Sequence, residues 1–398
     1  MERHAMTRLL VTLLVAGPLA IAGCGGDDGA PPPGPSPTPT ATATPSPTPT
    51  PQPTAFLIPV LPGAPRMVSN GFAISADGRV VVGLSESDLG DQAFRWTTNG
   101  NLQGLGMLAG YTASSAAHAV SADGSVVVGV SSASADSFRA FTWTAATGMQ
   151  PLGELPDWVV RSAALGISAD GQTVVGWAEG VDPNYDDDKT LCFVWTADAG
   201  FHLFGDFLPA NVNGTYCKAS AVSANARVTV GEARYDIVND LPVMQGFRFT
   251  RDSGLFPLGW VDNQAPTSNA LSASANGSVI GGSSDVMIEG LGNVPSPLRW
   301  TTTGGPVWLG LRLLGTVNAV SADGTAMGGG AADPGTAFVW DVENGYRNLY
   351  GLLLEAGLAD GLEGGSPINV SGMTPDGRVV VGTSLGAGLA RAYYVRLP

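Results

Sequence analysis

Short apolar segments follow one another along the chain after Thr54, and turn-forming residues separate them. The clearest example is "AISADGRVVVGLS", which begins at Ala73 and contains a run of valines that ends in Gly83. Apolar runs of this length predict strands, and no long stretch after Thr54 sustains the spacing of an amphipathic helix. A strand that is apolar throughout is typical of one covered on both faces. The pattern therefore predicts an all-β protein.

The pattern recurs in seven copies, spaced by 46 to 55 residues. Each copy holds four expected strands: A before the turn "SADG", B after it, C an aromatic run such as "AFRWT", and D an element such as "LQGLG". Four short strands per unit at this period predict the blades of a β-propeller. The Ser or Thr that opens each turn is Ser75, Ser121, Ser168, Ser223, Ser274, Ser321 and Thr374.

The two ends of the repeats predict how the propeller closes. Copy seven stops after strand C, whereas Phe56–Gly63 stands before copy one as a D strand without a blade. We therefore expect a seven-bladed β-propeller of four-stranded blades over residues 55–398, with the ring closed by the N-terminal strand completing the last blade. Closure of this kind leaves only short, protected edges.

Glycines mark two places in each copy. Asp-Gly or Asn-Gly links A to B in six of the seven copies, which predicts a tight hairpin with positive φ at both central residues. A glycine also ends strand B, as Gly83 does in the first copy, and it predicts a close backbone approach or a bulge.

The repeats resemble the bacterial extracellular HAF-repeat family, which shares the "ISADG", "AF-WT" and "LG" elements over about residues 56–398. The histidine of that family's signature is absent, and Gln92, Arg139 and Thr336 stand at its position. The resemblance implies a bacterial extracellular protein and no established activity.

The N-terminus carries a targeting segment. Arg3 and Arg8 precede an apolar run that is too short for a comfortable membrane span and ends in "IAGC" at Cys24. This resembles the bacterial lipoprotein signal, which implies removal of residues 1–23 and lipidation of Cys24. Met1 and Met6 both fit as the start, and an ordinary secretory signal with an incidental cysteine is the alternative.

Residues 24–54 follow as a Pro/Thr-rich segment, which predicts an extended polyproline stalk. By the same resemblance, Gly25 after the cysteine implies transfer to the outer membrane. We therefore expect a cell-envelope protein held to the membrane by its lipid anchor alone, facing either the periplasm or the outside.

The formal net charge of −15 disfavours nucleic acid as a partner, because a phosphate backbone would be repelled. No nucleophile elbow, phosphate loop or zinc-binding helix motif is present. Outside the signal the histidines are His118 and His202, which fall at different repeat positions. The sequence thus indicates no catalytic residue and no cofactor, and we expect a monomer.

Two cysteines remain if Cys24 is lipidated. Cys192 opens strand C of the third copy and Cys217 opens strand A of the fourth, on the same face and one connection apart. This placement predicts a disulfide in an oxidising compartment, with two buried free thiols as the alternative.

The B–C links span 16 or 17 residues in copies three to five, against 9 to 12 elsewhere, so we expect long loops there on the face that also carries the D–A links. Alternating oxygen donors in the third loop make a weak calcium candidate of Asp182, Asn184, Asp186 and Asp188, but no glycine turns the loop and a solvated acidic loop is favoured. The predicted binding-loop residues are Asp182, Asn184, Tyr185, Asp186, Asp187, Asp188, Tyr235 and Asp236.

Three functions fit this sequence. The first is a binding or adhesion module that contacts a protein or glycan through the B–C and D–A face of blades three to five. The second is a polysaccharide hydrolase or lyase with carboxylates at the channel mouth, and the third is a structural envelope protein without a ligand. The sequence favours the first, because it offers no acid–base pair for the second.

Overall fold

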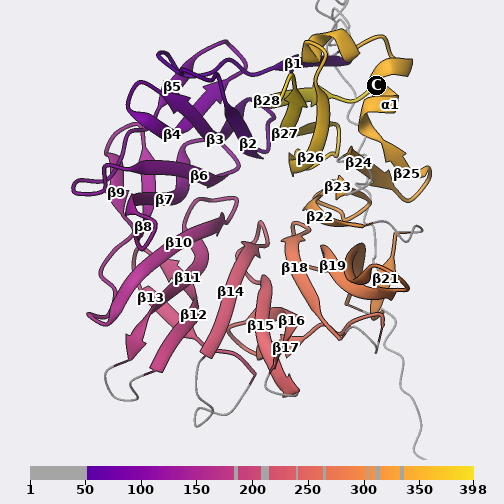
Figure 1. Ribbon diagram of the computed structural model, residues 1–398. Helices are drawn as coiled ribbons and strands as arrows, with labels where there is room; N and C mark the ends of the chain where they lie inside the picture. The colour runs from indigo at the N-terminus through magenta and orange to yellow at the C-terminus, as the bar shows by residue number, and fades with distance from the viewer. Residues whose placement is uncertain are drawn as a thin grey trace, which may run out of the picture. The chain divides into compact units, whose positions relative to one another are not determined.

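The computed structural model describes residues 52–182, 187–207, 215–238, 241–262, 266–302, 304–309, 314–331 and 336–398. The predicted signal, Cys24 and almost all of the stalk lie outside these ranges. The described strands repeat the order A, B, C, D, and Figure 1 shows the resulting units following one another about a common centre with the A strands innermost.

The inner half of each unit is an antiparallel pair of strands A and B. The A strands are β2 (Ser69–Ile74), β6 (Ser114–Val120), β10 (Val159–Ile167), β14 (Thr215–Val222), β18 (Ser268–Ala273), β22 (Gly315–Val320) and β26 (Ser366–Met373). The B strands are β3 (Val80–Ser87), β7 (Val126–Ser134), β11 (Thr173–Asp182), β15 (Thr229–Val238), β19 (Val279–Ile288), β23 (Ala326–Ala331) and β27 (Val379–Gly386).

The outer half adds strands C and D. The C strands are β4 (Gly90–Thr97), β8 (Ser137–Thr144), β12 (Asp187–Thr196), β16 (Leu241–Thr250), β20 (Gly292–Thr301), β24 (Thr336–Asp341) and β28 (Leu389–Arg396). The D strands are β5 (Leu102–Gly104), β9 (Gly148–Pro151), β13 (Gly200–Phe204), β17 (Gly254–Pro257), β21 (Pro306–Trp308) and β25 (Gly345–Asn348), while β1 (Thr54–Leu57) pairs with β28 in the last unit.

The same hydrogen bond joins neighbouring units at four seams among the described residues. A strand-C amide donates to the hydroxyl of a serine in strand A of the next unit, as from Ala93 N to Ser115 Oγ at 2.9 Å. The last unit makes the same bond to the first, from Ala392 N to Ser69 Oγ at 3.0 Å. Strand β2 accordingly lies against β26, β27 and β28, as each A strand lies against the unit before it.

The A–B turns differ from the prediction. Gly78 has a φ of +71°, but the aspartate before it is not left-handed, so only one central residue has positive φ. The reason is a side-chain network: Asp77 Oδ1 accepts from Ser75 Oγ at 2.6 Å and from Arg79 N at 3.0 Å. Ser75 Oγ in turn accepts from Val80 N at 2.9 Å. The Ser and Asp side chains thus shape the turn, and the glycine completes it.

The glycine that ends strand B marks a bulge in the strand beside it. A Cβ on Gly83 would overlap the carbonyl oxygen of Asn70, so the close approach is confirmed. The pairing of β2 with β3 shifts in register at Phe72, which is an extra residue in strand A. All seven A strands have a bulge at the matching position. His118 occupies this position in β6.

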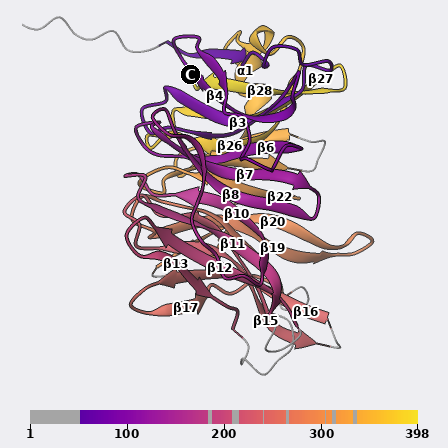
Figure 2. The same cartoon turned by 90° about the vertical axis from the view of Figure 1, so that its left-hand side faces the viewer.

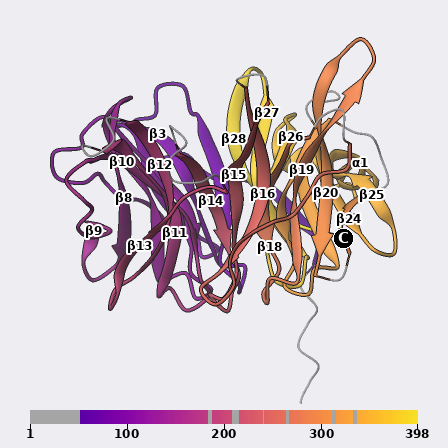
Figure 3. The same ribbon diagram turned by 90° about the horizontal axis from the view of Figure 1, so that it is seen from below.

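The long B–C links are mostly strand. In units three to five, β11, β12, β15, β16, β19 and β20 each have ten residues, against six in β23 and β24. The prediction of long loops was therefore wrong: the added residues pair with each other across the hairpin and satisfy their own backbone groups. Figures 2 and 3 show the β19–β20 hairpin projecting beyond its neighbours.

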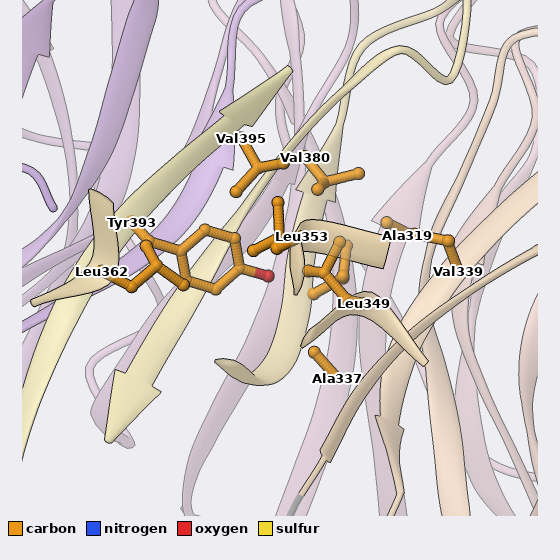
Figure 4. Close-up of a cluster of buried hydrophobic side chains, with 10 residues drawn as sticks. Ala319, Ala337, Val339, Leu349, Leu353, Leu362, Val380, Tyr393 and Val395 are labelled. Carbon is orange, nitrogen blue, oxygen red and sulfur yellow. The ribbon is translucent and has the colours of Figure 1, made fainter. Parts of the chain in front are cut away.

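The long link before the last unit is also structured. It forms a short helix α1 (Leu349–Glu355), which Asn348 caps by accepting from Gly351 N at 2.9 Å, and a 3-10 turn η1 (Ala359–Leu362). Figure 4 shows Leu349 and Leu353 packed beside Tyr393. This link therefore fills the core of the last unit.

Candidate binding site

The predicted acidic loop lies only partly within the described residues. Asn184, Tyr185 and Asp186 fall outside them, and Asp182 and Asp187 face each other as the last backbone pair of the β11–β12 hairpin. Asp188 is exposed. Among the described residues, no three His, Cys, Asp or Glu side chains gather as a metal site requires.

The two candidates of the fourth unit have local partners. Tyr235 packs edge-on against Phe207 and Trp260, with ring centroids 5.6 and 5.7 Å away. Asp236 is exposed and accepts from the amide of Ile237. Tyr235, predicted as a binding-loop residue, therefore packs on residues of the neighbouring links.

Cys192 and Cys217 form a disulfide in the structure, with their Cα atoms 5.0 Å apart. The bond joins β12 to β14 at the place where other seams have the amide-to-serine hydrogen bond: Cys217 stands where Ser162 stands one seam earlier. It brings the strands close enough to pair at two residues, so units three and four share one eight-stranded sheet instead of two separate ones.

A buried ion pair fixes the start of the following link. Asp206 Oδ2 accepts from Arg234 Nε at 3.0 Å and from the amide of Tyr216 at 3.1 Å, and both charged side chains are almost fully buried. The disulfide and this pair hold the third-to-fourth link at both of its ends. The adjoining side chains of β14 and β15 are therefore held in place.

Beside this seam, a cavity of about 350 Å³ opens between units two and three. Its lining includes His118, Phe138 and Trp177, with the hydroxyls of Ser132 and Ser134. The Phe138 and Trp177 rings meet edge to face at 5.6 Å. Burial lowers the pKa of His118 to about 4, so the imidazole is neutral at neutral pH.

Charged groups surround the Trp177 side of this cavity. The Lys218 ammonium lies 4.6 Å from the Trp177 ring centre and 5.1 Å from that of Tyr216. The Tyr216 hydroxyl donates to Glu232 Oε1 at 2.9 Å. Burial, and next the carboxylates of Glu232 and Glu179, raise the pKa of Tyr216 well above its usual value.

The far side of the cavity has its own charges. Arg161 pairs with Glu179 and lies 3.7 Å from the exposed Asp136 carboxylate. Its guanidinium also stands 5.8 Å from the Phe138 ring centre. The two aromatic rings are thus flanked by one cation on each side, which suits a ligand with both apolar and polar faces.

The predicted loops did not include this cluster, although the repeats carry a signal for it. The residue after the strand-B glycine is Leu84, Val130, Ser283, Gly330 or Thr383 in five copies, but Trp177 and Glu232 in the third and fourth. The cross-strand partner of Glu232 is Lys218, where the third copy has Ala163. Large or charged residues at positions that are otherwise small or neutral therefore mark the site.

No known family model and no curated protein matches the chain. Among solved structures, an oligogalacturonate lyase from Vibrio parahaemolyticus is similar over 87% of this chain and 97% of its own, with a TM-score of 0.52 and 11% identity. A prolyl endopeptidase is similar over 83% of this chain and 50% of its own, with a TM-score of 0.54 and 10% identity. TolB from Acinetobacter baumannii, of which this chain covers 64%, has a TM-score of 0.41 and 9% identity.

At this identity the likeness shows the fold alone, which is that of a β-propeller. No helix among the described residues has the length and apolarity to cross a bilayer.

Proposed function

We propose that the protein is an envelope-anchored, seven-bladed β-propeller of the HAF-repeat type that acts as a binding module. The pairing of β1 with β28 supports closure of the ring by the N-terminal strand. The hydrogen bond from Ala392 to Ser69, the same as at three other seams, supports it further.

The ligand-contact site is the cavity around Trp177, on the face where the hairpins of units three to five project. The observation that carries this proposal is the convergence of Trp177, Phe138 and neutral His118 on one opening, beside the Lys218 ammonium. Lys218 makes no hydrogen bond or ion pair among the described residues, so its charge is available to a ligand. A glycan or a protein side chain presents the mixture of apolar and polar groups that such a lining accepts.

Binding fits these groups better than polysaccharide cleavage does. Tyr216 is a poor base because its raised pKa keeps the phenol protonated. Glu232 accepts from that phenol, and Glu179 is paired with Arg161. The purely structural alternative gives no role to the opening beside this half-buried cation.

The test is a glycan and protein binding array probed with the full chain and with Trp177→Ala and Lys218→Gln. We expect both variants to lose at least about tenfold in affinity for whatever the wild type captures. Leu89→Ala, at an exposed hairpin tip of the first unit, is the control and should bind as the wild type does. Equal binding by all four proteins would place the contact elsewhere, and hydrolysis of an array glycan would favour the enzyme alternative.

The anchor is tested separately by Cys24→Ser. We expect this variant to leave the membrane fraction while the propeller unfolds at the wild-type temperature, because Cys24 precedes the first described strand. A variant that fractionates with membranes as the wild type does would refute lipid anchoring at this cysteine.

A further inference from the structure

Two further cavities lie on the opposite face, at the seam between units four and five. The first, of about 820 Å³, lies between the A–B turn and the C–D turn of unit four and reaches Asn276 in the next unit. The second, of about 450 Å³, continues from it over β17 to Trp300. Arg248 and Ser253 line both cavities, so the two adjoin.

Three arginines line the first cavity: Arg227, Arg248 and Arg251, against the single carboxylate of Asp252. Among the described residues, none of the three side chains makes a hydrogen bond or a close ion pair, although the charge of Arg251 helps to lower the pKa of Asp198. The Nε of Arg248 is buried and has no partner. A buried guanidinium N–H without a partner is costly, and an anionic ligand would satisfy it.

The equivalent arginines of other units are engaged by their neighbours. Arg95 Nε donates to the carbonyl of Gly124 at 3.1 Å, and Arg299 lies 5.0 Å from the ring centre of Trp340. Arg248 has neither contact. Arg95 also lines a cavity at its seam, but its Nε is held by the Gly124 carbonyl, whereas Arg248 lines both cavities here and its Nε has no partner.

The turns beside these arginines have lost their negative charge. Five of the seven A–B turns hold an aspartate, but the two that line this cavity hold Asn225 and Asn276. The amides keep the structural role of the carboxylate: Asn225 Oδ1 accepts from Ser223 Oγ at 2.8 Å and from Arg227 N at 3.1 Å. The chain has therefore kept the turn and removed two carboxylates where three cations converge, in a protein of net charge −15.

The second cavity supplies an apolar surface next to the cations. Phe256 is 64% exposed and faces Arg248 directly on the neighbouring strand. The hydroxyls of Ser278, Thr301 and Thr302 line the rest. These groups match a pyranose that carries an acidic group. The guanidiniums would bind its oxyanion, the exposed ring would contact its apolar face, and the hydroxyls would form hydrogen bonds with its hydroxyl groups.

We propose that the seam between units four and five binds an acidic oligosaccharide, with its sulfate or carboxylate held by Arg227, Arg248 and Arg251 and a sugar ring packed on Phe256. This site shares no residue with the Trp177 cavity and lies on the other face of the propeller, so it stands independently of the function proposed above.

The test is calorimetric titration of the full chain with a sulfated heparin hexasaccharide, an alginate hexasaccharide, neutral cellohexaose and inorganic sulfate. We expect the acidic hexasaccharides to bind, more weakly as salt is raised, and cellohexaose not to bind. Arg248→Gln and the double variant Asn225→Asp/Asn276→Asp should each weaken binding at least about tenfold. The double variant restores the aspartate of the other five turns, so its unfolding temperature should stay at the wild-type value.

Two controls make the result specific. Arg79→Gln/Arg378→Gln removes two charges from the equivalent position of other units and should leave binding unchanged. Phe256→Ala should weaken hexasaccharide binding while leaving any binding of sulfate unaltered. The proposal is overturned if neither acidic hexasaccharide binds, if Asn225→Asp/Asn276→Asp binds as the wild type does, or if inorganic sulfate binds as tightly as the hexasaccharides.

Discussion

Replacing Ile58 by alanine tests whether the N-terminal strand closes the propeller. Ile58 follows β1 and is fully buried among Val81 and Trp96 of the first unit and Tyr394 of the last. Its amide also donates to Ala392 O in β28 at 2.8 Å. The side chain therefore packs between the two ends of the repeat region.

The size of the effect follows from this burial. Truncating a fully buried isoleucine to alanine costs about 2–5 kcal/mol through lost burial and the cavity left behind. A domain of roughly 350 residues unfolds with an entropy of about 0.7 kcal/mol per kelvin, so the melting temperature should fall by about 3–7 °C.

Differential scanning calorimetry of the full chain measures this directly. Leu89→Ala is the control, because Leu89 is an exposed side chain and should change the melting temperature by less than about 1 °C. If the N-terminal strand did not close the ring, Ile58 would be exposed and its truncation would be equally silent. A change of less than about 1 °C for Ile58→Ala would thus refute closure.

Two further predictions concern the seams near the Trp177 cavity. Because the pKa of His118 is about 4 in the folded protein and about 6.5 when unfolded, the unfolded chain takes up this proton first, and stability should fall as the pH drops from about 6.5 to 4. His118 keeps some solvent exposure, so we expect the wild type to lose about 2 kcal/mol of unfolding free energy over this range, and His118→Gln not to show this loss. Urea unfolding at the two pH values measures both proteins, and an equal loss in wild type and variant would contradict the prediction. The double variant Cys192→Ala/Cys217→Ser recreates the alanine–serine pair of the earlier seams, and its unfolding free energy should be about 3 kcal/mol lower than that of the wild type. Peptide mass spectrometry tests the bond itself: alkylation of both thiols in native, unreduced wild-type protein would rule out the disulfide.

The strand order was predictable because the sequence of each unit contains the same turn and strand motifs. "SADG" marks a turn wherever it occurs, and the β1 pairing followed from counting strands in the copies. The glycine before Leu84 signalled a close approach, but not which strand would bulge. The glycine lies in strand B and the extra residue in strand A, so the sequence of strand B alone does not locate the bulge.

The candidate site was less predictable, because its members come from three units. Phe138, Trp177 and Lys218 lie on β8, β11 and β14, and only the arrangement of the units brings them together. Link length was a misleading guide: residues added to the B–C links extended the hairpins, and those added before the last unit formed α1 and filled its core.

Departures from the repeat are a better guide to function than insertions are, for a physical reason. A position that is small or neutral in most copies is under no packing demand for a large or charged side chain, so a tryptophan or lysine there needs another cause. Trp177 and Lys218 meet this condition on one face. On the other face Asn225 and Asn276 depart from the repeat in the opposite sense, because each places a neutral amide where the other five turns hold an aspartate. Cys217 replaces the serine of other seams in the same way, and its partner there is covalent. The substitutions concentrate in units three to five, whose neighbours provide rigid support, so the repeated scaffold and the sites can change independently of each other.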